Sequence, residues 1–224
     1  HIARGGRERL ETFHPRGFRF LQVTARAHGR AVRIERAGVV RQGYPLEKRG
    51  EFKCSDPFLN RLWDMGWNAL RLCAEDIYTD CPWRERTLYG GDLLAEAATA
   101  LVTTGDPRLN RRSMAVLFQS QEADGSMQSH GPLAHHRPSL SDYPLLTALN
   151  AEWHCRWSRD LAFAREWEPA IRRLLDWSCQ HADRRGVVSP PTPSFFDWVA
   201  MPKEGPLCAY QALVPRVQFA HASH

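Results

Sequence analysis

The sequence predicts a mainly α-helical domain that follows a short β-rich segment. Three observations support this fold class. Apolar residues recur at helical spacing from residue 55 onward, residues 18–24 and 31–40 are β-rich with imperfect alternation, and clusters of turn residues separate the helical runs. Because short connections favour antiparallel neighbours, we expect the helices to form antiparallel pairs.

The β-rich segment at the start of the chain is expected to supply two or three strands. Residues 18–24 and residues 31–40 are both rich in β-branched or aromatic side chains. Residues 41–54 form a polar linker with two glycines and one proline. We therefore place the β segment at residues 1–45 and the helical domain at residues 46–224.

The helical part begins at a favourable capping position. Ser55 is expected to cap the first helix, and Pro57 lies in its first turn. The apolar stripe of this helix comprises Leu59, Leu62, Trp63, Gly66, Leu70, Cys73 and Ile77. Further helices are expected near residues 91–104, 108–121, 142–158, 160–183 and 206–219, with turn-rich breaks at 105–107, 123–141 and 189–194.

Composition and charge indicate an ordinary globular protein. At 224 residues, with 43% hydrophobic and 25% charged side chains, the chain can bury one good core. The formal net charge is +5, but the arginines are scattered rather than gathered into runs with aromatic residues, which argues against a nucleic-acid partner. No apolar stretch approaches the roughly 20 residues of a spanning helix, so no membrane partner is expected.

Cysteine usage favours a reduced, cytoplasmic protein without a metal or other cofactor. None of the six cysteines forms a Cys-x-x-Cys pair, which argues against a zinc ribbon or a redox motif. His135 and His136 are adjacent, so they cannot share one helix face as a metal-binding pair. The chain opens at His1 without an apolar signal segment, and we expect it to be a cut from a longer protein.

Residues 80–92 are the strongest candidate for an active site. They read Asp-Cys-Pro-Trp-Arg-Glu-Arg-Thr-Leu-Tyr-Gly-Gly-Asp and lie between two apolar segments with helical spacing. This stretch contains three carboxylates, two arginines and two aromatic rings. Carboxylates this close together can perturb one another, which is the usual basis of acid–base catalysis. The alternative is a salt-bridged helix connection, with Asp80 paired to Arg84, Glu85 paired to Arg86, and Asp92 capping the next helix.

This motif resembles the signature of the bacterial α-L-rhamnosidases, family 78 of the glycoside hydrolases. The resemblance rests on Asp-Cys-Pro at 80–82, then Glu85, Tyr89, and Gly-Asp at 91–92. It extends upstream to residues 18–20 and 54–60, and downstream to residues 124–126 and 196–198. The resemblance implies a catalytic (α/α)6 barrel preceded by a β-sandwich, so that this chain holds the last sandwich strands and the first half of the barrel.

The family implies a role for each residue of the motif. Glycosidic bonds break through an oxocarbenium-like transition state that needs a proton donor and a second carboxylate. The donor must keep its proton near neutral pH, which requires burial or a nearby like charge. By resemblance Glu85 is the general acid, Asp80 and Asp92 bind sugar hydroxyls, and Tyr89 packs on the apolar face of the sugar. Arg84 matches a position that varies in the family and is a further candidate for substrate binding.

Two later segments also match residues that line the sugar pocket. Asp142 and Tyr143 open a helix, where the family has an Asp and an aromatic residue; a plain Ser141/Asp142 helix cap is the alternative. Asp197 and Trp198 lie in a Pro-flanked loop, where Trp198 matches a pocket aromatic that Asp197 can hold in place.

The family's second glutamate, the general base, lies far downstream of the acid. Glu204 is the only glutamate after Glu168, and its Pro-Lys-Glu-Gly-Pro context does not match the base motif. We expect a chain without its base, and possible self-association through helix faces that the other half of the barrel covers. Three hypotheses remain open: part of an inverting α-L-rhamnosidase acting on a rhamnose-containing glycoside, an inactive or truncated carbohydrate-binding barrel fragment, and a barrel glycosidase or lyase for another sugar.

Overall fold

Helices dominate the computed structural model of the chain. It describes residues 5–27, 29, 31–132, 139–185, 192, 195 and 214–217. The named elements over these residues are α1 (Pro57–Cys73), β1 (Leu88–Tyr89), α2 (Gly90–Thr103), α3 (Arg108–Phe118), β2 (His130–Gly131), α4 (Asp142–Ser158) and α5 (Leu161–Cys179). The predicted mainly helical fold is confirmed, and the expected helix bounds are close to the observed ones. Of the helix expected at 206–219, residues 214–217 are described, and they are helical.

The first helix begins one residue later than the sequence predicted. Asp56, not Ser55, occupies the N-cap position, and its Oδ1 accepts a hydrogen bond from the Phe58 N–H at 2.7 Å. The reason is that Pro57 fixes the first helical position, so the capping side chain must come from the residue directly before it. Of the apolar stripe predicted for α1, only Leu70 is buried within the helix.

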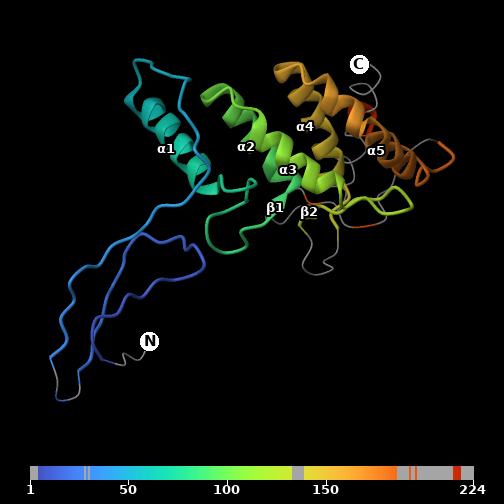
Figure 1. Cartoon of the computed structure of the whole chain (residues 1–224). Coiled ribbons are helices and arrows are strands. Elements are labelled where there is room, and N and C mark those ends of the chain that lie inside the picture. Colours follow the sequence, from blue (N-terminus) through green and yellow to red (C-terminus); the bar gives the residue numbers. More distant parts are fainter. Residues whose placement is uncertain are drawn as a thin grey trace.

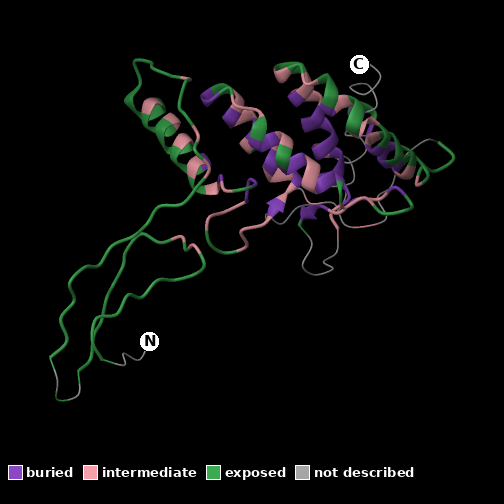
Figure 2. Cartoon of the chain, in the orientation of Figure 1, coloured by how far each residue is buried: buried purple, intermediate pink, exposed green. Residues whose placement is uncertain are grey.

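The segment before α1 does not form the expected strands. Residues 18–24 and 31–40 have neither helical nor strand structure, and they are exposed throughout (Figure 2). A strand is stabilised by a hydrogen-bonded neighbour, and the described residues of this segment form no ladder with one another. Figure 1 shows the segment as an extended excursion away from the helices. It rejoins them where the Tyr44 N–H donates to Ala74 O at 2.8 Å and the Gly50 N–H donates to Thr103 O at 2.7 Å.

The helices α2–α5 form two hairpins that lie side by side. Residues 104–107 join α2 to α3, and residues 159–160 join α4 to α5. The most extensive helix contact joins α2 to α4. These two helices run in the same direction, because Gly90 lies against Tyr143 at their N-terminal ends and Leu101 lies near Trp157 at their C-terminal ends. Helix α3 packs on both α2 and α4, and α5 packs on α3 and α4.

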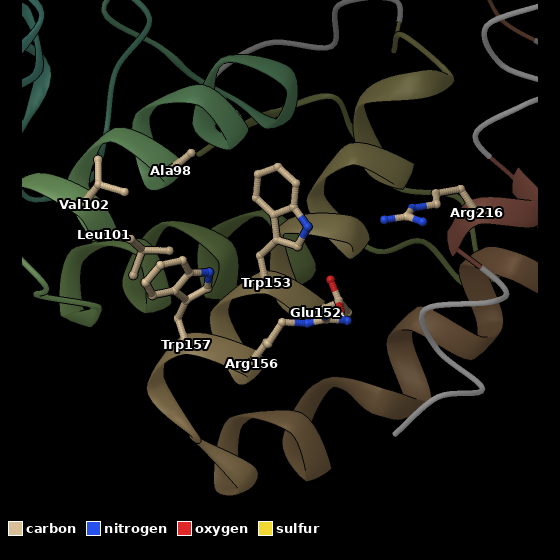
Figure 3. A pocket seen from close by; sticks show the side chains of 8 residues that line it. All are labelled: Ala98, Leu101, Val102, Glu152, Trp153, Arg156, Trp157 and Arg216. Carbon is tan, nitrogen blue, oxygen red and sulfur yellow. Dashed lines mark hydrogen bonds and ion pairs between the residues drawn. The ribbon is translucent and has the colours of Figure 1, made fainter.

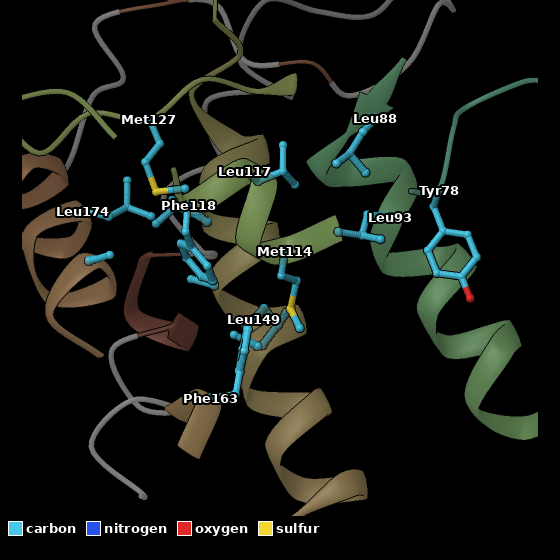
Figure 4. Packing of buried hydrophobic residues seen from close by; sticks show 14 of the residues in the cluster. Tyr78, Leu88, Leu93, Met114, Leu117, Phe118, Met127, Leu149, Phe163 and Leu174 are labelled. Carbon is cyan, nitrogen blue, oxygen red and sulfur yellow. The ribbon is translucent and has the colours of Figure 1, made fainter. Parts of the chain in front are cut away.

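The core lies between these hairpins. Figure 4 shows Leu93 of α2, Met114 and Phe118 of α3, and Phe163 of α5 directed into one cluster. Phe118 stacks on Trp167 with ring centroids 5.2 Å apart. This packing holds the first turns of α2 and α4 at one end of the molecule. Among the helices that the structure describes, none has the length and apolar character needed to cross a membrane.

Candidate active site

The loop that carries Glu85 is closed by Asp80 and Thr87. The Asp80 N–H donates to Thr87 O at 3.0 Å, and the Thr87 N–H donates to Asp80 Oδ1 at 2.9 Å. The Asp80 side chain therefore replaces a backbone partner, as short carboxylates often do in turns. One oxygen of this predicted sugar ligand is thus engaged in holding the loop.

Glu85 lies at the outer side of this loop. Its side chain is 29% exposed, and Oε1 accepts a hydrogen bond from Arg84 Nη2 at 3.0 Å. The Glu85 N–H points to Cys81 Sγ at 3.4 Å, and Glu85 O accepts from the Thr87 hydroxyl at 3.1 Å. The alternative pairing of Glu85 with Arg86 and Asp80 with Arg84 is wrong, because Arg84 pairs with Glu85 and Arg86 pairs with Glu75.

Arg86 connects the loop to neighbouring segments of the chain. Its φ of 47° lies in the left-handed region, which is strained for a residue with a side chain. The guanidinium forms a half-buried ion pair with Glu75 and donates to Pro15 O at 3.4 Å. These contacts compensate the backbone strain and tie the loop to the end of α1 and to the N-terminal segment.

Two glycines let the first turn of α2 approach α4. A Cβ at Gly90 would lie 2.4 Å from Thr147 Oγ1 and 2.7 Å from Tyr143 O, and a Cβ at Gly91 would lie 2.7 Å from the Tyr143 ring. The Gly90 N–H donates to Ser129 O at 2.9 Å, which continues the antiparallel pairing of Leu88–Tyr89 with His130–Gly131. Only glycine fits where the two helices come this close. The two glycines after Tyr89 therefore set the distance between the first turns of α2 and α4.

Asp92 lies in the first turn of α2, beside Tyr143. It does not cap the helix, because Tyr89 occupies the cap position. Burial raises the pKa of Asp92, and the charges of Asp80 and Glu85 raise it further; a hydrogen bond from the Tyr143 hydroxyl acts in the opposite direction. The positive end of the α2 dipole also favours a carboxylate here. The structure therefore brings two predicted sugar ligands, Asp92 and Tyr143, into direct contact.

Asp142 holds a different segment in place. It is buried in the first turn of α4, and its Oδ1 accepts from the Phe195 N–H at 3.1 Å. Burial raises the pKa of its carboxyl group. Ser141 is at the cap position but makes no side-chain cap bond; its hydroxyl instead donates to Thr192 O at 2.9 Å. Asp197 and Trp198, the other predicted pocket residues, lie outside the described residues.

Aromatic rings surround the Asp92–Tyr143 pair. The Tyr89 ring lies 6.1 Å from Tyr143, almost perpendicular to it, and 5.5 Å from the ring of His130. Phe195 packs edge-on against Tyr143 at 6.1 Å. His130 was not among the predicted residues, because the pairing of β1 with β2 joins positions that are distant in sequence and carries no pattern that reveals it.

Glu96 is a second residue that the motif did not reveal. It follows Asp92 by one helical turn, and its Oε2 is fully buried with no hydrogen-bond partner in the described part of the chain. Burial raises the pKa of Glu96 to about 9, and the charges of Asp92 and Asp80 add to the shift. The hydroxyl of Tyr78, itself fully buried, also lacks a partner among the described residues. The i, i+4 spacing from Asp92 could have identified Glu96.

The described residues offer no obvious metal site, and an open cavity lies away from the acidic first turns. No group of three His, Cys, Asp or Glu side chains over the described ranges is arranged to hold a metal ion. A cavity of about 270 Å³ opens between the C-terminal halves of α2 and α4 (Figure 3). Its walls include Leu101, Trp153, Trp157 and Arg216, away from the acidic first turns. The carboxylates thus occupy one end of the helix pair, and the apolar cavity lies toward the other.

The chain has the features of a helical-hairpin domain: paired helices, acidic first turns at one end, and a half-buried glutamate on the loop between α1 and α2. A sequence model of the bacterial alpha-L-rhamnosidase six-hairpin glycosidase domain matches residues 47–222. The chain belongs to this family. The predicted partial (α/α) barrel is confirmed by this match together with the helical hairpins.

Solved structures share this fold. A family 78 rhamnosidase of Bacillus sp. GL1 matches 80% of the chain with a TM-score of 0.68 and 23% identity. A rhamnosidase from Klebsiella oxytoca with rhamnose bound matches 75% of the chain, with a TM-score of 0.61 and 24% identity. The Streptomyces avermitilis alpha-L-rhamnosidase complexed with L-rhamnose matches 79%, with a TM-score of 0.65 and 22% identity. At these identities the likeness establishes the fold.

The matches differ in how much of each relative the chain spans. It covers 21% of the Bacillus protein, 38% of the Klebsiella protein and 18% of the Streptomyces protein. No curated protein sequence matches the chain.

Proposed function

We propose that the protein containing this chain is an inverting α-L-rhamnosidase that removes terminal α-L-rhamnose from glycosides, with Glu85 as its general acid. Family membership supports the reaction class. One observation carries the assignment of the site: the loop of Glu85, the Asp92–Tyr143 pair and the Tyr89 ring meet at the N-terminal end of α2 and α4. Two of the similar structures carry rhamnose, which supports the same sugar for this chain.

Each residue then has a defined task. Asp92, oriented by Tyr143, and the second carboxylate oxygen of Asp80 accept hydrogen bonds from sugar hydroxyls. Tyr89 and Tyr143 pack on the apolar face of the ring. Glu85 donates its proton to the glycosidic oxygen as the bond to the anomeric carbon breaks. A water attacks that carbon from the opposite face and gives its proton to a second carboxylate. Arg84 orients Glu85 by donating a hydrogen bond from Nη2 to Oε1.

The second carboxylate of the inverting mechanism is not assigned to a described residue. Inversion needs two carboxyl groups roughly 6.5–9.5 Å apart, with a water between them. Asp142 is a poor candidate, because its Oδ1 already accepts from the Phe195 N–H. We also propose that residues 46–224 form the first half of the barrel. Residues 1–45 would end a β-sandwich, in which they would gain the strand partners that the described residues lack here. Apolar α1 side chains such as Leu62 and Met65 are exposed, so they are available for contact with the other half or with a second copy.

The decisive test is the Glu85→Gln variant in the complete protein. Glutamine keeps the shape but cannot donate a proton, so we expect hydrolysis of an unactivated rhamnoside to fall by about 10²–10⁴-fold. Rhamnose binding and the melting temperature should stay close to those of the parent protein. Proton NMR of the first product anomer reports inversion. Turnover at the parental rate would remove Glu85 from this role.

The second candidate function is sugar binding without turnover. The observation in its favour is that the described residues supply an acid and sugar ligands but no assigned base. The purified 224-residue chain distinguishes the two functions. Rhamnose binding without hydrolysis by this chain, combined with hydrolysis by the complete protein, supports the enzyme; binding without hydrolysis by both supports the binding module.

A further inference from the structure

We propose that Trp83, Arg84 and Arg16 form a subsite for the leaving group, and that this subsite takes a sugar that bears a carboxylate, such as a uronic acid. The inference rests on the proposed function of Glu85 and names the substrate class of the same site. It concerns the solvent-exposed residues beside Glu85 in the loop.

The position of the acid determines where the leaving group lies. A general acid protonates the oxygen that joins the two parts of the substrate, so one part lies on each side of it. The Asp92–Tyr143 pair and Tyr89 are buried or half-buried, and they suit the rhamnose ring. We therefore place the leaving group on the solvent-exposed side of Glu85, which is the outer side of the site.

The outer side presents an aromatic ring and two guanidinium groups. Trp83 is 50% exposed, although large aromatic side chains are usually much more buried. The Arg16 guanidinium lies over its ring, 5.4 Å from the centroid. Arg84 has a 79% exposed side chain and reaches back to Glu85. A half-exposed indole with cations beside it suits a sugar ring that carries negative charge.

The N-terminal segment is held in place for this contact. A Cβ at Gly17 would lie 2.9 Å from Pro82 O and 3.0 Å from Trp83 Cβ, so the backbone of the segment packs directly on the loop. Arg86 donates to Pro15 O at 3.4 Å from the other side. Arg16 lies between these two contacts in the sequence. The packing of the neighbouring backbone therefore holds its side chain over Trp83.

The test compares two rhamnosides that differ only in the leaving sugar. Rhamnose linked to D-glucuronate and rhamnose linked to D-glucose are hydrolysed by the complete protein, and the ratio of their kcat/KM values is measured. We expect the ratio to favour the uronate, to shrink with added salt, and to fall by about fivefold in Arg16→Ala, as for an exposed ion pair. Arg19→Ala is the matched control, because Arg19 is also exposed and lies 5.5 Å from the ring centroid of Phe20.

A second measurement uses the 224-residue chain and does not require activity. The NMR signal of the Trp83 indole N–H, assigned with Trp83→Leu, is followed during titration with D-glucuronate and with D-glucose. We expect a shift with glucuronate that Arg16→Ala weakens and Arg19→Ala leaves intact. Equal shifts with both sugars, or equal effects of the two arginine variants, overturn the charged subsite. Rhamnose binding, followed through Asp92→Asn, tests the proposed function separately.

Discussion

The two ends of the α2–α4 pair differ in how their side chains are held. At the N-terminal end, Asp92 and Asp142 are fixed by hydrogen bonds from Tyr143 and Phe195, and glycine allows the close approach of the helices. At the C-terminal end, Trp157 is 62% exposed beside an open apolar cavity. The same pair of helices is therefore rigid and polar at one end and loosely filled at the other.

This difference follows from the direction of the helices. Their N-termini carry partial positive charge, which favours carboxylates, and their C-termini favour cations. Asp92 and Asp142 lie in first turns, whereas Arg156 lies in the last turn of α4. We therefore expect substitutions at the acidic end to affect stability or sugar binding strongly, and substitutions at the open end to affect both weakly.

The largest effect on stability should come from Glu96. Near it lie Asp92, Asp80, Cys73 and Tyr78, and no cation appears among the groups that shift its pKa. By contrast Glu152, in the C-terminal half of α4, pairs with Arg156. Because the folded pKa of Glu96 is raised to about 9 from 4.5, the folded chain keeps a proton that the unfolded chain releases.

The sign of the pH dependence follows from this difference. Below about pH 4.5 Glu96 is protonated in both the folded and the unfolded chain, so it adds no pH dependence to the free energy of unfolding. Between about pH 4.5 and 9 the free energy of unfolding should fall as pH rises, by up to about 1.4 kcal/mol per pH unit from this one group. Guanidinium unfolding of Glu96→Gln and of the parent chain at several pH values isolates this contribution. Parallel pH profiles would show that Glu96 is ionised in the folded state.

A smaller loss of stability is expected for Gly90→Ala. The added methyl group would overlap Thr147 Oγ1 and the backbone oxygen of Tyr143, so the cost should be about 1–3 kcal/mol. Gly66→Ala in α1 is the matched control, because its Cβ would meet nothing within 4 Å. That control should be neutral or should stabilise the chain by up to about 1 kcal/mol, since alanine favours helix. Similar unfolding free energies for both variants would contradict the close approach of α2 and α4.

The sequence predicted these features unevenly. Helical periodicity predicted α1–α5, because the spacing of apolar residues along a helix is a local pattern that can be read from the sequence. The motif at 80–92 placed Glu85, Tyr89 and Asp92, which are close in sequence. The contact of His130 with Tyr89 was not predicted from the sequence, because it depends on the pairing of two-residue strands in which these residues are 41 positions apart. The strands expected before α1 are absent from the described part of the chain. A strand needs a hydrogen-bonded partner, and a local sequence pattern does not specify that partner.

Asp92→Asn should weaken rhamnose binding by roughly tenfold, because a charge-assisted hydrogen bond contributes about 1.5–3 kcal/mol and an amide retains part of it. The folded state should be little changed or slightly more stable, since burial already disfavours the charge of Asp92. Isothermal titration of L-rhamnose and a melting curve measure the two effects. A lower melting temperature with unchanged binding would assign Asp92 a structural role instead.

The smallest effect is expected at the open end, for Trp157→Ser. Trp157 is 62% exposed, and exposed substitutions usually change stability by no more than about 0.5 kcal/mol. It belongs to the C-terminal half of α4, whereas the sugar ligands lie in the first turns, so rhamnose affinity should stay within about twofold of the parent value. Trp167→Ser is the contrasting variant, because that ring stacks on buried Phe118 and its loss should cost about 3–5 kcal/mol. Weaker rhamnose binding in Trp157→Ser would mean that the binding site extends along the helix pair into the cavity, and that the two ends are one functional surface.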